Sequence, residues 1–185
     1  VLQWKREGII EPPFMEWLAA ESYRITGSEL LWIPRLYSIL FWTAGGIGLF
    51  LLSRRISSMP GAIAALAFYM ILPYGVIASR AFQPDPLMTA LIVWAWWAVQ
   101  RWSEKPGYGW AAAAGLLGGA AILVKSVAVF FIAPAFAATT VQTLGFKKAV
   151  HSGKIWVMAA LAILPYGAYL VYGVWGAGFL ASQFS

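Results

Sequence analysis

The stretch Arg80-Ala-Phe-Gln-Pro-Asp-Pro86 lies between two long apolar runs, residues 59–79 and 87–100. It carries the single carboxylate of a long segment, Asp85, with a proline on either side. The two prolines predict that the preceding helix stops here, because proline lacks the N–H and restricts the residue before it. If the apolar runs cross a membrane, Asp85 lies near its surface, where an unpartnered charge is costly. The stretch is therefore either a polar turn between two membrane helices or part of a functional cavity.

The composition indicates a polytopic membrane protein. Of 185 residues, 61% are hydrophobic and only 11% are charged, which is too apolar for a soluble domain. The net charge of +6 comes from residues placed between the apolar runs; such basic loops fit anionic lipid better than nucleic acid. There is no cysteine, and His151 is the single histidine, which excludes thiolate and His-rich metal sites. We expect His151 to be solvated; the sequence requires no metal, and whether a divalent ion takes part stays unknown.

Six apolar runs have about the length, roughly 20 residues, that crosses a bilayer. They are residues 36–52, 59–79, 87–100, 110–124, 127–144 and 155–173. Pro73, Pro134 and Pro165 lie inside runs, where neighbouring helices tolerate a kink, and Gly115, Gly118 and Gly119 predict close helix contacts. The expected fold is an all-α polytopic transmembrane helix bundle over residues 30–175, followed by an extracytoplasmic tail, 176–185.

Residues 1–29 predict an extracytoplasmic loop with an amphipathic helix. Pro12-Pro13 suits a helix start, Phe14, Trp17 and Leu18 recur at helical spacing, and Gly27 suits the stop. A helix of about 13 residues is too short and too charged to span, so we expect it to lie in the membrane interface. The alternative is a loop helix that packs on the bundle and has no further role.

The distribution of basic residues predicts the orientation. Seven basic residues fall in the loops on one side, which is then cytoplasmic: Arg54, Arg55, Arg101, Lys105, Lys147, Lys148 and Lys154. The turns on the other side hold only two, Arg80 and Lys125. Four N-terminal residues oppose this assignment: Lys5, Arg6, Arg24 and Arg35. The charged residues that the assignment places outside the cytoplasm include Glu7, Glu11, Arg80, Asp85 and Lys125.

The outer turns suggest an anion-binding cavity. Lys125 sits in a tight turn, where it either reaches the lipid headgroups or binds a phosphate as a point charge. Arg80 is able to grip a phosphate with two N–H groups. Asp85 is expected to lie in the same cavity, because two spans separate the turns and return the chain to the same side. In an empty cavity we expect Asp85 to pair with Arg80, its near neighbour in the sequence.

Three motifs resemble those of C-type (GT-C) membrane glycosyltransferases. Glu11-Pro-Pro-Phe-Met-Glu-Trp-Leu resembles the segment "(His or Lys)-Pro-Pro-Leu-x-x-Trp-Leu", Arg80-Ala-Phe-Gln-Pro-Asp resembles "Arg-x-x-x-Pro-Asp", and Leu123-Val-Lys-Ser resembles "Leu-x-Lys-Gly". Their order, spacing and membrane side agree over residues 5–145. The group is the protein-O-mannosyltransferase-like one, which includes the lipid A aminoarabinose transferases.

This resemblance implies transfer of a sugar from a polyprenyl-phosphate-linked donor to an extracytoplasmic lipid, glycan or protein, in the inner membrane of a bacterium. It implies that Lys125, Arg80 and the position of Glu11 bind substrate, and that Asp85 acts at the catalytic site. Glu11 and Ser126 depart from the pattern, which has His or Lys and Gly there. The family's catalytic base is expected upstream of Val1, in a longer chain of which this is a piece.

Two other classes stay open. One is a non-catalytic membrane subunit that packs with other subunits in a larger complex. The other is a transporter, which would place charges inside spans near the midplane, whereas here they lie at the ends of the apolar runs.

Overall fold

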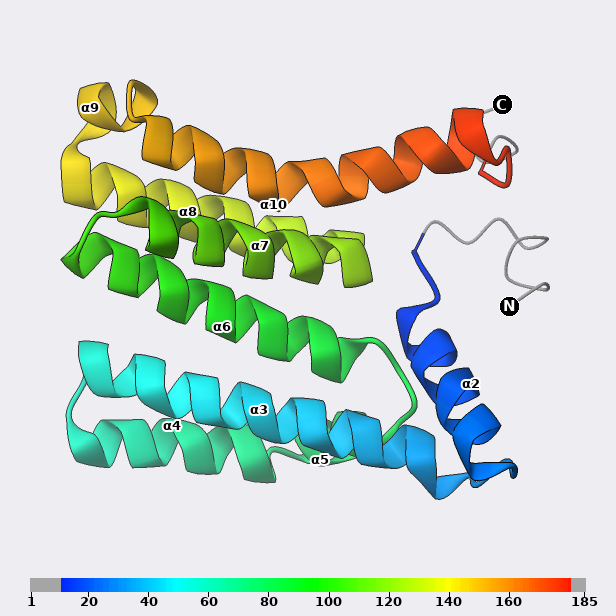
Figure 1. Ribbon diagram of the computed structural model, residues 1–185. Coiled ribbons are helices and arrows are strands. Elements are labelled where there is room, and N and C mark those ends of the chain that lie inside the picture. The colour runs from blue at the N-terminus through cyan, green and yellow to red at the C-terminus, as the bar shows by residue number, and fades with distance from the viewer. Residues whose placement is uncertain (1–10, 181–185) are drawn as a thin grey trace.

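In the computed structural model, which describes residues 11–180, the regular elements are helices (Figure 1). In chain order they are α2 (Phe14–Thr26), α3 (Trp32–Ile56), α4 (Met59–Ile71), α5 (Pro73–Arg80), α6 (Asp85–Glu104), α7 (Tyr108–Val124), a 3₁₀ turn (Ser126–Ala128), α8 (Val129–Leu144), α9 (Phe146–Val150), α10 (Gly153–Val171) and a π-helical turn (Tyr172–Gly176). The predictions for residues 1–10, which include Lys5, Arg6 and Glu7, and for residues 181–185 concern positions outside the described residues.

The prediction of an all-helical protein with several membrane-spanning helices is confirmed. Among the described residues, three helical segments are long and apolar enough to cross a membrane: Trp32–Ile56, Ser126–Leu144 and Gly153–Gly176. The helices α4 and α5 pass the same test only together, with a bend of 59° between them, which is the form of a broken span or of a re-entrant loop. The apolar helix α7 is shorter, at 17 residues. Large apolar side chains on the outside, such as Phe68, Phe130 and Leu164, give the bundle the surface that lipid requires.

Prolines set the breaks between the helices. Leu72 has an extended ψ of 129°, because a residue before proline avoids the helical region, and Pro73 then starts α5. Pro84 precedes α6, and the helix begins at Asp85 with Pro86 in its first turn, where a missing N–H costs nothing. The helix α6 is thus longer at both ends than the predicted run 87–100. The helices α8 and α10 continue through their internal prolines.

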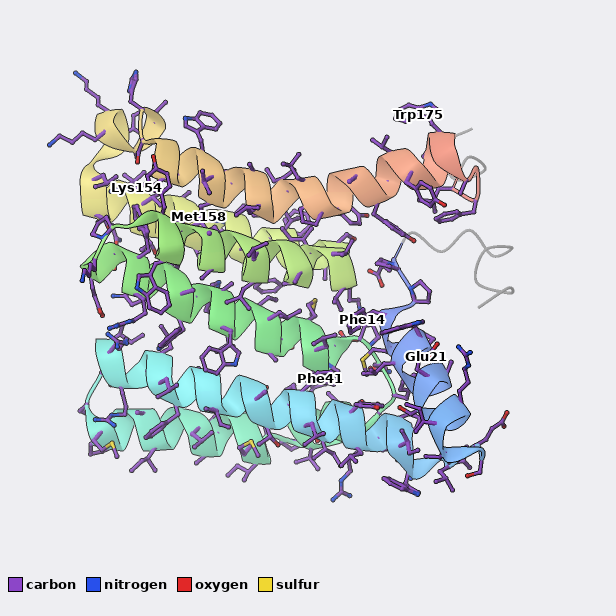
Figure 2. The ribbon with its side chains drawn as sticks, in the orientation of Figure 1. Phe14, Glu21, Phe41, Lys154, Met158 and Trp175 are labelled. Atoms are coloured by element: carbon purple, nitrogen blue, oxygen red, sulfur yellow. The ribbon has the colours of Figure 1, made fainter. Side chains whose placement is uncertain are left out.

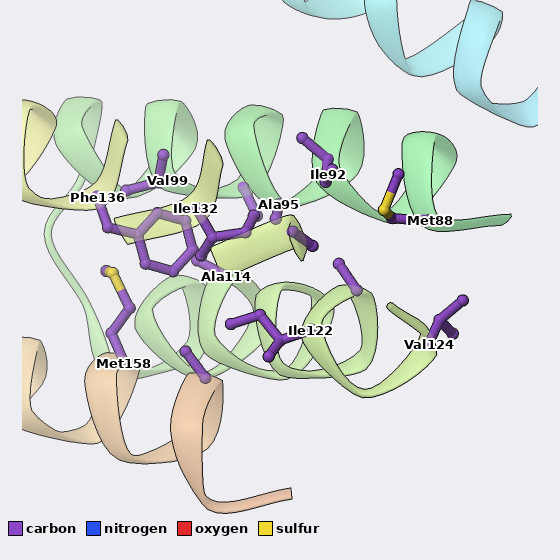
Figure 3. Close-up of a cluster of buried hydrophobic side chains, with 14 of the residues drawn as sticks. Met88, Ile92, Ala95, Val99, Ala114, Ile122, Val124, Ile132, Phe136 and Met158 are labelled. Atoms are coloured by element: carbon purple, nitrogen blue, oxygen red, sulfur yellow. The ribbon is translucent and has the colours of Figure 1, made fainter. Parts of the chain in front are cut away.

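The helix α7 packs between α6 and α10 at the centre of the bundle. Side chains of α6 such as Met88, Ile92 and Val99 meet Ile122 of α7 and Ile132 of α8 in one buried cluster (Figure 3). The predicted close contacts of the α7 glycines are confirmed. A Cβ on Gly115 would lie 2.6 Å from the Met158 carbonyl oxygen of α10, and one on Gly118 would lie 3.0 Å from the Ile132 side chain.

The helix α2 has the predicted length of 13 residues; it packs on the bundle through residues outside the predicted apolar stripe, so Phe14 and Trp17 of that stripe stay on the outer side, as in a helix that lies in the membrane interface. Met15 and Ala19 are buried, at 1% and 5% exposure, whereas Phe14 and Trp17 are exposed. The Ser22 and Tyr37 hydroxyls join α2 to α3 through a hydrogen bond of 2.5 Å. Gly27 ends the helix with a φ of 67°, a conformation that glycine adopts readily.

The bundle has two chemically different ends. At one, which we call the α2 end, α2 lies across the bundle, α5 and α7 finish, and α6 begins (Figure 1). At the other, the α9 end, α3 and α6 finish and α7 begins. Figure 2 places Phe14 and Glu21 at the α2 end and Lys154 at the α9 end.

Candidate anion-binding site

Asp85 and Lys125 form a salt bridge at the α2 end. The Lys125 Nζ donates to both carboxylate oxygens of Asp85, over 3.0 and 3.1 Å. The two side chains are partly buried, with 31% and 23% of their areas exposed. The residues are 40 positions apart in the chain, so the pair forms only when α6 and α7 pack together.

The helix ends explain why these residue types suit these positions. Asp85 is the first residue of α6, where the positive end of the helix dipole stabilises a carboxylate. Lys125 follows the last residue of α7, where the negative end stabilises a cation. The Lys125 backbone is extended, with φ −155° and ψ 117°, and its N–H donates to the Ala121 carbonyl over 3.0 Å. Since α6 and α7 are antiparallel neighbours, the start of one meets the end of the other.

Glu11 belongs to the same cluster. Its carboxylate accepts a hydrogen bond from the backbone N–H of Ser126 and lies within electrostatic range of Lys125 and Asp85. Burial raises the pKa of the Glu11 carboxyl above 4.5; Lys125 opposes this shift, and Asp85 adds to it. The cluster therefore brings one cation and two carboxylates together, one of which holds its proton more tightly than usual.

Arg80 lies in a different place from the one predicted. It lines an open groove of about 560 Å³ between α2, α3 and the end of α5, together with Glu16, Tyr23 and Arg35. Within residues 11–180 the salt-bridge partner of Asp85 is Lys125. The expectation that Asp85 pairs with Arg80 is therefore wrong, because α5 ends on the side of the turn that faces α2.

The cluster holds one ammonium against two carboxylates. An anion that reaches the partly buried Lys125 would replace Asp85 as its partner, so the ammonium would keep an opposite charge beside it. In the described part of the chain no group of three or more His, Cys, Asp or Glu side chains is placed to hold a metal ion. His151 is exposed, as expected, and its Nδ1 lies 2.8 Å from the Lys147 carbonyl oxygen.

The backbone N–H of Ser126, which binds the Glu11 carboxylate, is a group of this site that the sequence does not predict. In the sequence Ser126 stands out only because the resembled motif has glycine at this position. Every residue except proline has a backbone N–H, so the residue type does not reveal such a donor. The usable signal was the tight turn after α7, since backbone N–H groups in such turns are free to bind carboxylates or phosphates.

These features define a multi-pass membrane protein with a charged site at one end of its helical bundle. The chain belongs to the dolichyl-phosphate-mannose-protein mannosyltransferase family, whose model matches residues 10–175. Membership confirms the resemblance carried by the three motifs, and it makes the chain a membrane glycosyltransferase-family protein. No curated protein and no solved structure gives a significant match.

Proposed function

We propose that this chain takes part in transferring a sugar from a polyprenyl-phosphate donor to an extracytoplasmic lipid, glycan or protein in the bacterial plasma membrane. The observation that carries the proposal is the partly buried Lys125–Asp85 pair with Glu11 beside it. The family match supports the donor class, since its description names a dolichyl-phosphate sugar.

The proposal includes six membrane crossings. The helices α3, α6, α7, α8 and α10 and the bent pair α4–α5 run alongside one another (Figure 1). The helices α6 and α7 pack against neighbours of spanning length, so we assign them to the membrane as well. The α2 end then lies outside the cytoplasm, because the α9 end carries most of the basic loop residues.

Lys125 is assigned to the donor phosphate. In the transfer step the acceptor oxygen or nitrogen forms a bond to the anomeric carbon, and the bond from that carbon to the phosphate oxygen breaks. The phosphate leaves with the electron pair, and the Lys125 ammonium compensates its growing negative charge. Asp85 keeps Lys125 in place when no phosphate is bound. The acceptor's proton goes to a general base.

An apolar groove supports a lipid-linked donor. Its volume is about 250 Å³, and Ile122, Val129 and Ile132 line it near the centre of the bundle. Val129 is four residues from Lys125 in the sequence, and the lining continues toward the α9 end as far as Thr140 and Ile155. An isoprenoid chain in this groove would bury apolar surface while its phosphate stays near Lys125.

The test compares Lys125→Ala with Lys154→Ala, which removes a lysine at the α9 end. The full chain in nanodiscs is titrated with undecaprenyl phosphate and with the unphosphorylated polyprenol, and transfer from a polyprenyl-phosphate sugar is measured in membranes. Loss of a charge-assisted contact predicts weaker phosphate binding by about tenfold or more for Lys125→Ala, with polyprenol binding unchanged. Equal phosphate binding by both variants would refute the role of Lys125. Binding without any transfer would favour a non-catalytic subunit.

A further inference from the structure

A second charged cavity lies at the α9 end, far along the bundle from Lys125. It is an open cavity of about 480 Å³ lined by Leu51, Arg54, Arg55, Trp97 and Glu104. These residues come from the end of α3 and the last turns of α6. The cavity is therefore formed between two neighbouring helices of the bundle, at the depth where the helices leave the apolar region.

The Glu104 carboxylate binds Arg55, which lines the cavity, and Arg101, which is outside the lining. The Arg55 Nη1 donates to both Glu104 oxygens, over 2.5 and 2.7 Å, and the Arg101 Nη1 donates to one of them over 3.0 Å. A guanidinium has five N–H donors, and Arg55 uses only those on Nη1 for Glu104, so its other donors remain for another acceptor in the cavity. The Arg101 Nε is buried and has no hydrogen-bond partner in the described structure.

Aromatic rings hold the arginines from the other side. The Arg101 guanidinium carbon lies 6.0 Å from the ring centre of Trp97 and 5.4 Å from that of Trp110. The Arg54 guanidinium carbon lies 5.9 Å from the Phe50 ring, and among the described residues Arg54 forms no salt bridge. The lining thus holds two arginines, Arg54 and Arg55, against one glutamate, and Arg101 draws on the same glutamate from outside the lining.

We propose that this cavity binds the phosphodiester headgroup of an anionic phospholipid. Guanidinium groups match phosphate oxygens in geometry as well as charge, and basic pockets between membrane helices recognise such headgroups. Leu51 and the Trp97 ring provide an apolar wall for the first carbons of the acyl chains. The site is independent of the donor site, because it lies at the opposite end of the bundle.

The experiment uses the full chain in neutral detergent and native mass spectrometry. Phosphatidylglycerol is the probe, phosphatidylcholine, a zwitterion whose phosphodiester is balanced by its own ammonium group, is the comparison without net charge, and soluble glycerol phosphate is a competitor. Arg54→Ala is the main variant because Arg54 forms no salt bridge that the fold needs. We expect it to weaken phosphatidylglycerol binding about fivefold, and Arg55→Lys, which keeps the charge without the planar fork, to weaken binding by a smaller factor.

Lys148→Ala is the matched control, since it removes a cation from the α9 end without touching the cavity. It should leave phosphatidylglycerol binding within about twofold. A thermal melt without lipid shows whether each variant is folded. Equal losses for Lys148→Ala and Arg54→Ala would reduce the effect to general surface charge and overturn the site. Equal binding of phosphatidylcholine, or full competition by glycerol phosphate, would overturn the assignment to an anionic lipid.

Discussion

At the scale of single residues, the salt-bridge partner of Asp85 in the cluster at the α2 end depends on contacts between residues distant in the chain. The sequence names Glu11, Asp85 and Lys125, but it does not say which cation Asp85 takes. Arg80 is nearer in the chain, yet it lies in the groove beside α2, and Lys125 takes the salt bridge from 40 residues away. The N-terminus of α6 favours a negative charge and the C-terminus of α7 a positive one. The packing of these two helix ends therefore pairs Asp85 with Lys125.

Glu11 predicts a pH dependence of phosphate binding. Burial raises the pKa of its carboxyl, so the group takes up a proton at a higher pH than an exposed glutamate does. The charged form competes with a phosphate for Lys125, and the neutral form does not. At a pH above that raised pKa, Glu11→Gln should therefore tighten binding of polyprenyl phosphate by roughly two- to fivefold, measured in nanodiscs.

Comparing Glu11→Gln with the parent protein at each pH separates the titration of Glu11 from that of the phosphate. The phosphate loses charge near pH 6, which acts on both proteins alike, so the ratio of the two affinities isolates Glu11. That ratio should approach one as the pH falls toward the Glu11 pKa. Weaker binding by Glu11→Gln at every pH would show that Glu11 supports the site and does not compete with its ligand.

At the scale of elements, close contact between α7 and α10 depends on residues without side chains. A Cβ on Gly119 would meet the Leu161 carbonyl and lie 3.2 Å from Pro165 Cγ and 3.3 Å from the Ala162 Cα. Backbone atoms cannot move aside as a flexible side chain does. Because α7 also carries Lys125 at its end, a shift of this helix would move the cation as well.

Gly119→Ala should therefore separate α7 from α10 and lower the free energy of unfolding by about 1–3 kcal/mol. Gly109→Ala is the control in the same helix, because nothing lies within 4 Å of its Cβ position, and alanine there favours the helix. Thermal unfolding of both variants in detergent measures the difference. If Gly119→Ala melts with the parent protein, α7 and α10 are farther apart in the membrane than described here.

At the scale of the whole molecule, the two ends of the bundle predict its orientation. The α2 end carries the proposed donor site and the α9 end the proposed phospholipid site. The chain has no cysteine, so single cysteines report sidedness directly. In intact cells a membrane-impermeant thiol reagent should label Gln83→Cys at the α2 end and leave Val150→Cys unlabelled until the cells are opened. Both parent residues are exposed; the reverse pattern would show that the orientation is inverted.

The sequence by itself determined the helical membrane class, the break at Pro84, the extent of α2 and the family resemblance. These follow from apolar run length, proline and glycine chemistry and short motifs, all of which act along neighbouring residues. Only the tertiary structure decided that Lys125 and not Arg80 pairs with Asp85, and that Met15 and not Trp17 is buried. Such contacts depend on which helix ends and faces meet, and that is set by packing between elements distant in the chain.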